Sequence, residues 1–295
     1  METNKNIEIA GVTEAKSCCG PDCCGEGKTD KSAELKKAVR EKYAEIAKRG
    51  NASGCCGTEC GCNDGVDYNV FQDDYSNLEG YVADADLGLG CGVPTEFAGI
   101  KEGETVVDLG SGAGNDVFVV RSIVGEKGKV IGLDMTEEMI KKARVNNSKL
   151  GFNNVEFRFG DIEEMPVEDN IADVVISNCV LNLVPDKQKA FSEIYRILKP
   201  GAHFCVSDVV IKGNMPEELR ESAELYVGCV SGALDEKEYL STIAEAGFKN
   251  IEIKKSKANH LPDDMLEAFL SPEGICEYKN SVKGIFSITV VGYKN

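Results

Sequence analysis

From about residue 105 to residue 208, short apolar runs alternate with longer amphipathic stretches. The apolar runs predict strands at Thr105–Leu109, Lys129–Leu133, Val155–Phe159, Ala172–Ser177 and His203–Asp208. The amphipathic stretches predict helices at Val117–Val124, Glu137–Leu150 and Lys187–Leu198. Strands that alternate with helices in this way form a parallel sheet with helices on both faces, so we predict an α/β fold.

The periodicity changes on both sides of this region. Before it, the pattern predicts a helix from Ser32 to Arg49, followed by a small-residue loop. Beyond it, the pattern predicts helices at Pro216–Val227 and Glu236–Ala246 and a closing strand pair at Asn250–Lys254 and Ile285–Tyr293. We therefore expect three parts: a Cys-rich, partly disordered N-terminal segment with one helix (1–67), the α/β domain (68–209), and a smaller α+β part that covers the site (210–295).

A glycine-rich turn follows the first predicted strand, where Val106–Asp116 reads VVDLGSGAGND. Its glycines allow a tight turn and let a ligand approach the main chain, and the N–H groups of the next helix point at that ligand. The third glycine comes one residue earlier than in the G-x-G-x-x-G dinucleotide motif. At the end of the second strand, the carboxylate of Asp134 is placed to accept hydrogen bonds from both hydroxyls of a ribose. Together these features favour a nucleoside ligand over a purely structural turn.

Further polar residues follow the predicted strands at their carboxyl ends. Asp161 and Ile162 come after the third strand, and Asn178 and Cys179 come after the fourth. Ligands of parallel α/β sheets bind at this edge, so these residues are candidates for contact with the same ligand. A helix cap is the alternative role for Asp161.

The charge and the hydrophobic content limit the partners of the protein. A formal net charge of -17 argues against a polyanionic partner such as a nucleic acid or an anionic membrane face. No stretch approaches the roughly 20 apolar residues of a membrane span, and Met1–Ala10 lacks the apolar core of a secretory signal. We therefore expect a cytoplasmic protein, with a monomer as the default state.

The 13 cysteines are unusual for such a protein, because a reducing compartment disfavours structural disulfides. Clustered thiols then indicate metal, soft-element or redox chemistry. Cys91 and Cys229 lie among glycines, and Cys179 lies where a thiol would face the ligand of the sheet. Cys205 and Cys276, by contrast, fit the role of small buried hydrophobes.

Four segments carry a family resemblance: Asp86–Pro94 (DLGLGCGVP), Val106–Asp116, Ser177–Leu183 (SNCVLNL) and Tyr226–Leu234 (YVGCVSGAL). Together they resemble the arsenite S-adenosylmethionine methyltransferases, over roughly residues 35–260. The glycine turn is shared by class I methyltransferases in general, whereas the three cysteine contexts are specific. The resemblance implies a Rossmann-like class I methyltransferase fold and methyl transfer from S-adenosylmethionine to trivalent arsenic.

The resemblance also implies roles for individual residues. Cys179 and Cys229 match the cysteines that bind arsenic(III), and Cys91 matches one that joins them or exchanges disulfides with them. A fourth cysteine corresponds to Cys55 or Cys56, while the cluster Cys18–Cys24 stays unassigned. The residues expected to bind S-adenosylmethionine are Asp108, Gly110, Ser111, Gly112, Gly114, Asp116, Asp134, Met135, Asp161, Ile162 and Asn178.

The chemistry of arsenic agrees with these residues. Trivalent arsenic is thiophilic, and three thiolates leave it a lone pair that attacks the sulfonium methyl without a general base. Methylation makes arsenic formally pentavalent, and we expect cysteines to return two electrons by forming a disulfide that thioredoxin or glutathione reopens. The incoming substrate is arsenite or its glutathione conjugate. Of the two histidines, His203 is expected to be structural, and His260 has no catalytic-looking setting.

Two other functions are open at this point. A carbon- or oxygen-methylating class I enzyme of the quinone type would share the glycine turn, but it would not require Cys91, Cys179 and Cys229. A protein that sequesters arsenite or zinc through its N-terminal cysteines would not need a pocket for S-adenosylmethionine. The spacing Cys55-Cys56…Cys60-x-Cys62 also departs from the paired C-x₂-C zinc pattern.

Overall fold

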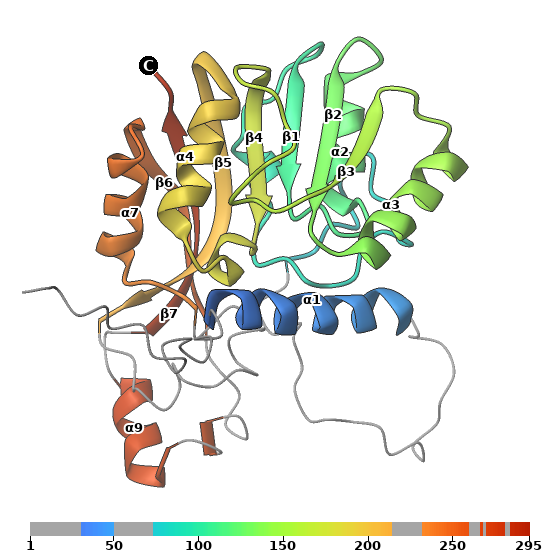
Figure 1. Cartoon of the computed structure of the whole chain (residues 1–295). Coiled ribbons are helices and arrows are strands. Elements are labelled where there is room, and N and C mark those ends of the chain that lie inside the picture. Colours follow the sequence, from blue (N-terminus) through green and yellow to red (C-terminus); the bar gives the residue numbers. More distant parts are fainter. Residues whose placement is uncertain (1–30, 50–72, 214–231, 260–265, 268–269, 281–283) are drawn as a thin grey trace, which may run out of the picture.

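The computed structural model describes residues 31–49, 73–213, 232–259, 266–267, 270–280 and 284–295. In this part of the chain, one sheet holds seven strands in the order β3-β2-β1-β4-β5-β7-β6 (Figure 1). The strands are β1 (Thr105–Leu109), β2 (Lys129–Asp134), β3 (Val155–Phe159), β4 (Ala172–Asn178), β5 (Leu198–Lys212), β6 (Lys249–Asn259) and β7 (Gly284–Tyr293). The first five are parallel, and β7 pairs antiparallel with both β5 and β6. The predicted α/β class is therefore confirmed.

Helices cover both faces of the sheet: α2 (Asn115–Val124) and α3 (Glu137–Leu150) lie on one face, and α4 (Lys187–Ile197) and α7 (Glu236–Glu245) lie on the other. Two further helices, α1 (Lys31–Arg49) and α9 (Pro272–Asn280), lie off these faces. Alternate strand residues face opposite sides, so Val107 packs with α4 and α7, whereas Val106 packs with α2 and α3. Figure 1 shows α1 running across the sheet at the carboxyl ends of the parallel strands.

The C-terminal strands complete this same sheet. The predicted closing pair is present, but both strands are longer than expected, and β5 extends to Lys212 by pairing with β7 down to Gly284. The boundary expected after residue 209 therefore falls inside β5. The predicted helix Pro216–Val227 lies outside the described residues. The division into three parts stays a prediction.

Two of the cysteines expected to be buried have different environments. Cys205 is fully buried in β5, and burial raises the pKa of its thiol to about 12. The expectation for Cys276 is wrong, because this residue is exposed on α9. The run around Cys276 is too short and polar to bury a whole helix face, which is also why α9 was not predicted.

The remaining fold-level expectations concern His203 and membrane spans. The His203 ring is partly buried, and its Nε2 lies 2.6 Å from the carbonyl oxygen of Ala98. His203 thus ties β5 to the loop before β1, as expected for a structural residue, whereas His260 lies outside the described residues. Within the described ranges, the helices are all too short or too polar to cross a membrane.

Candidate active site

The turn between β1 and α2 is shaped by glycines with positive φ. Gly110, Gly112 and Gly114 have φ values of 68°, 51° and 102°. A Cβ at Gly110 would lie 2.3 Å from Cγ2 of Val180, so neither the backbone nor the space allows a side chain there. The N–H groups of Gly110 and Ser111 both donate to the carbonyl oxygen of Leu133, which anchors the turn to β2.

Asp134 fixes the position of this turn relative to β2. Its carboxylate accepts hydrogen bonds from the backbone N–H of Gly112 at 3.0 Å and from that of Thr136 at 2.7 Å. Thr136 is the N-cap residue of α3, but its side chain makes no capping hydrogen bond. Burial raises the pKa of Asp134, and these two N–H donors oppose that rise.

Three buried carboxyl groups surround the turn, on Asp108, Asp116 and Asp134. Burial, and then the charges of Asp116 and Asp134, raise the pKa of Asp108 well above its ordinary value. Burial also raises the pKa of Asp116 to about 6, although hydrogen bonds from Tyr75 and Asn178 lower it. Such a group of carboxyls favours a cationic ligand, because a positive charge would offset the cost of their ionisation.

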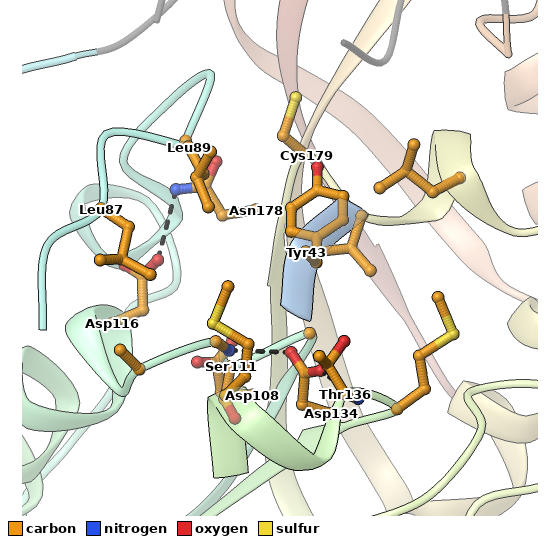
Figure 2. A pocket seen from close by; sticks show the side chains of 18 of the residues that line it. Tyr43, Leu87, Leu89, Asp108, Ser111, Asp116, Asp134, Thr136, Asn178 and Cys179 are labelled. Atoms are coloured by element: carbon orange, nitrogen blue, oxygen red, sulfur yellow. Dashed lines mark hydrogen bonds between the residues drawn. The ribbon is translucent and has the colours of Figure 1, made fainter. Parts of the chain in front are cut away.

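A single pocket brings together most of the residues expected to bind a cofactor. It is lined by Asp108, Gly110, Ser111, Gly112, Asp116, Asp134, Met135, Asp161, Ile162 and Asn178, and also by Cys179. Gly114 does not line it and serves as the N-cap of α2. Figure 2 shows Cys179 and Tyr43 at one end of this pocket and Asp108, Ser111 and Asp134 at the other.

Two polar atoms in this pocket are left for a ligand. Among the described residues, Oγ of Ser111 and Oδ1 of Asn115 are buried and have no hydrogen-bond partner within the protein. Buried polar groups are normally satisfied, so such atoms at the glycine turn indicate that a polar ligand completes them. The carboxyls and these atoms together fit a cationic nucleoside such as S-adenosylmethionine.

Helix α1 closes one side of the pocket, which the sequence pattern did not predict. Lys36, Val39 and Tyr43 line the pocket from this helix. The Lys36 ammonium lies 2.7 Å from a carboxylate oxygen of Asp161 and 2.7 Å from one of Glu163. Burial raises the pKa of Asp161, but the hydrogen bonds from Lys36 and from the backbone of Glu163 outweigh it and hold the pKa below its usual value.

Cys91 and Cys179 come together beside the pocket, although they are distant in sequence. The two sulfur atoms and a carboxylate oxygen of Asp208 all lie within 4.8 Å of one another, and all three residues are buried. Cys179 has a φ of 59°, which is rare for a residue with a side chain, and its N–H donates to the carbonyl oxygen of Ser207 at 2.8 Å. Strained backbone of this kind is typical of functional sites.

Asn178 holds the Cys91 loop against the end of β4. Its Oδ1 accepts from the backbone N–H of Cys91 at 3.1 Å, and its Nδ2 donates to the carbonyl oxygen of Gly92 at 2.8 Å. The glycines beside Cys91 permit this contact, since a Cβ at Gly90 would lie 2.7 Å from Asn178 Nδ2 and one at Gly92 would lie 2.7 Å from Ser207 Oγ. Close packing against Asn178 and Ser207 is therefore one reason for the glycines on either side of Cys91.

Asp208 is a residue of this site that the sequence analysis missed. Its two carboxylate oxygens accept hydrogen bonds from the backbone N–H of Val209 at 3.0 Å and from the Tyr239 hydroxyl at 3.2 Å. Burial raises the pKa of Asp208 to about 7, while the Val209 N–H and the charge of Lys187 oppose the rise. The signal was available in the sequence, because Asp208 is an acidic residue inside the apolar run of β5.

Three of the expected site cysteines, Cys55, Cys56 and Cys229, lie outside the described residues. The described part of the chain therefore brings together Cys91 and Cys179 and leaves the positions of the other three as predictions.

Comparisons with known proteins agree with this fold and identify the family. A family model described as a methyltransferase domain matches residues 100–247. The arsenite methyltransferase of Halobacterium salinarum is 44% identical over 233 residues, 75% of this chain and 59% of that protein. The crystal structure of CrArsM, an arsenic(III) S-adenosylmethionine methyltransferase from Chlamydomonas reinhardtii, is 35% identical with a TM-score of 0.60, and the match covers 70% of this chain and 67% of that one. The ubiquinone/menaquinone biosynthesis C-methyltransferase of Escherichia coli is 30% identical over 68% of this chain and 77% of that protein.

The strand order, the glycine turn and the matching family model define a class I methyltransferase. Within that class, the chain belongs to the arsenite methyltransferase family. The chain spans 53–60% of the length of the curated arsenite methyltransferases that it matches.

Proposed function

We propose that this protein transfers methyl groups from S-adenosylmethionine to trivalent arsenic held by Cys91, Cys179 and Cys229. The observation that carries the proposal is the meeting of two buried thiols, Cys91 and Cys179, beside a pocket built around the glycine turn. A quinone-type methyltransferase has no use for this pair of thiols. A sequestering protein has no use for the pocket.

The residues around the turn would hold S-adenosylmethionine. The carboxyls of Asp108, Asp116 and Asp134 suit its positive charges, and Ser111 supplies a polar atom that has no hydrogen-bond partner within the described protein. The carboxylate of Asp161 would accept from the adenine amino group, with Ile162 against the ring. When bound, S-adenosylmethionine supplies an electrophilic methyl group on a sulfonium.

The thiolates would orient arsenic toward that methyl group. Three sulfur ligands leave a lone pair on arsenic, and in-line attack by this pair forms the As–C bond as the S–CH₃ bond breaks. No proton is transferred in this step, so the protein supplies position rather than acid–base catalysis. The strained backbone at Cys179 and the Asn178 contact with Cys91 support such a positioning role.

Arsenic leaves this step formally pentavalent and must regain two electrons. Two cysteine thiols would supply them by forming a disulfide, with Cys91 and Cys55 or Cys56 as the expected pair. Thioredoxin or glutathione would then reduce the disulfide by thiol exchange. The need for reduced thiols fits a protein of the cytoplasm, where it would act as a monomer. It would detoxify arsenic, which would reach the site as arsenite or as its glutathione conjugate. The segment 1–67 would supply the exchanging cysteine, and the part 210–295 would cover the arsenic with Cys229.

The proposal is tested by incubating the protein with arsenite, S-adenosylmethionine and a thiol reductant, and by separating the arsenic species by chromatography with elemental mass spectrometry. Methylated arsenic is expected from the native protein and from Cys276→Ser, whose exposed thiol is the matched control. The Cys179→Ser and Cys229→Ser proteins should form none. Binding of S-adenosylmethionine without methylated arsenic would overturn the arsenic assignment, and quinone-like acceptors would be tried next.

A further inference from the structure

The two thiols and the carboxylate in the cluster of Cys91, Cys179 and Asp208 form a mixed donor set. We propose that this cluster binds a thiophilic divalent cation, Zn²⁺ or Cd²⁺, and that the cation excludes arsenic(III) from the site. The exclusion rests on the proposed function, whereas the binding itself does not. The cluster would then select between two kinds of thiophilic ligand by means of its one oxygen donor.

The distances within the cluster are close to those of a metal centre. The three donor atoms lie within 4.8 Å of one another. Donors bound to one tetrahedral zinc at about 2.0–2.3 Å lie roughly 3.5 Å apart. Side-chain rotations that bring the atoms closer by about 1 Å therefore complete the geometry, with a fourth position left for water or for another side chain.

Neighbouring groups hold the Asp208 carboxylate and the backbone of both cysteines, so only the thiols need to rotate. The Asp208 carboxylate is held by the N–H of Val209 and the hydroxyl of Tyr239, so its orientation does not depend on the ion. The backbone of Cys179 is fixed by Ser207, and that of Cys91 is fixed by Asn178. A cation entering the cluster would thus meet preoriented ligands, which favours tight binding.

The chemistry of the donors separates the two ligands. Zn²⁺ and Cd²⁺ accept thiolate and carboxylate ligands together, and their filled d shells impose no strict geometry. Two thiolates and one carboxylate also neutralise the charge of a divalent cation and leave one negative charge in excess. Arsenic(III) is softer, and three thiolates satisfy it, so it gains little from an oxygen donor. Removal of the carboxylate should therefore weaken cation binding and spare arsenic binding.

The experiment uses the full chain. It reads each cysteine separately, because thiols elsewhere in the chain also bind these ions. The protein is reduced with a phosphine, titrated with Cd²⁺ and alkylated with iodoacetamide, and the alkylation of each cysteine is quantified by peptide mass spectrometry. Cys91 and Cys179 should become protected together, with one midpoint. In Asp208→Asn that midpoint should rise by about tenfold or more, whereas the midpoint for protection by arsenite should change less than about threefold.

Controls come from the same chain. Asp173→Asn removes a carboxylate at the opposite end of β4, where it contacts Thr105 and Lys199, and it should leave both midpoints unchanged. The cysteines at 18–24 serve as internal controls, since their protection should not respond to Asp208→Asn. If Asp208→Asn does not fold, Cys91→Ser provides the second variant, and in it Cd²⁺ should no longer protect Cys179.

Two results would overturn the inference: alkylation of Cys91 and Cys179 that Cd²⁺ does not slow, or equal Cd²⁺ midpoints in the native protein and Asp208→Asn. The methylation assay on metal-free protein separates this outcome from the proposed function. Methylation without Cd²⁺ protection would defeat the cation site alone. Cd²⁺ protection without methylation would defeat the proposed function and the exclusion of arsenic, and it would leave the cation site standing.

Discussion

The side chain of Asn178 accepts a hydrogen bond from the backbone N–H of Cys91, with 3.1 Å between the two atoms. Asn178 ends β4 and directly precedes Cys179, so one residue links the loop of the first thiol to the strand of the second. The same side chain donates to Tyr75 and Asp116, which border the cofactor pocket. One amide group therefore links the Cys91 loop, the end of β4 and the edge of the cofactor pocket.

Asn178→Ala is expected to impair both the site and the fold. It removes the acceptor of the Cys91 N–H and one of the hydrogen bonds of the Tyr75 hydroxyl, which keeps its bonds to Asp116 and to the carbonyl oxygen of Gly92. The loss should cost about 2 kcal/mol of unfolding free energy. Displacement of Cys91 should lower kcat/KM for arsenite by about 10–100-fold. Steady-state kinetics and urea unfolding measure the two effects.

The control is Asn154→Ala, which removes hydrogen bonds to the carbonyl oxygens of Gly125 and Gly128 far from the thiols. It should lose a similar amount of stability and keep its kcat/KM. Equal kinetic losses in both variants would show that Asn178 acts through stability alone.

Asp116→Asn is expected to change the pH dependence of stability. Burial raises the pKa of Asp116 to about 6, so the folded protein binds this proton more tightly than the unfolded chain does. The cost of ionising Asp116 is therefore absent below pH 4, grows as the pH rises, and is complete above pH 6. Without cofactor, the variant should nearly match the native protein at pH 4 and exceed it by about 3 kcal/mol at pH 7. Urea unfolding across pH 4–8 measures the difference, and a difference that does not vary with pH would contradict the assignment.

Gly110→Ala is expected to disable the glycine turn. The new Cβ would meet Val180 at 2.3 Å, in a backbone with φ of 68°. We expect a loss of about 3 kcal/mol or more and no detectable binding of S-adenosylmethionine by calorimetry. Gly151→Ala is the matched control, because Gly151 has φ of 70° with nothing within 4 Å of a Cβ, and it should cost only about 1–2 kcal/mol. Similar losses in the two variants would mean that backbone strain, and not the contact with Val180, decides the effect.

Lys36→Gln is expected to loosen α1. The Lys36 side chain is mostly buried and pairs with Asp161 and Glu163, whereas Lys37 is exposed and lies 3.9 Å from Glu41. Hydrogen exchange of peptides from 31–49 should become faster in Lys36→Gln and stay unchanged in Lys37→Gln, because exposed pairs contribute little. Unchanged exchange in both variants would mean that apolar packing around Val39 alone holds the helix.

Much of the fold could be predicted because its signals are local. The apolar runs that form β1 to β4 and the glycines of the turn are sufficient to predict the local conformation. The place of Asp134 in the site was predicted from its distance along the chain from the glycine turn. The extension of β5 to Lys212 could not be predicted, because it depends on pairing with β7 from the far end of the chain. The same holds for Lys36 over Asp161 and for Asp208 beside Cys91, which are contacts made only after folding.

The backbone of Cys179 has one more consequence. Its φ of 59° and the hydrogen bond from its N–H to Ser207 fix the direction of the Cα–Cβ bond, so the sulfur moves about one side-chain torsion only. Chain folding thus removes the backbone freedom of this residue before any ligand arrives, and under the proposed function arsenic binding would have only the thiol torsion left to order. Glycine, and to a lesser degree asparagine, would tolerate this backbone, but neither carries a thiol. The strained backbone at position 179 therefore places the side chain of Cys179 before the ligand binds.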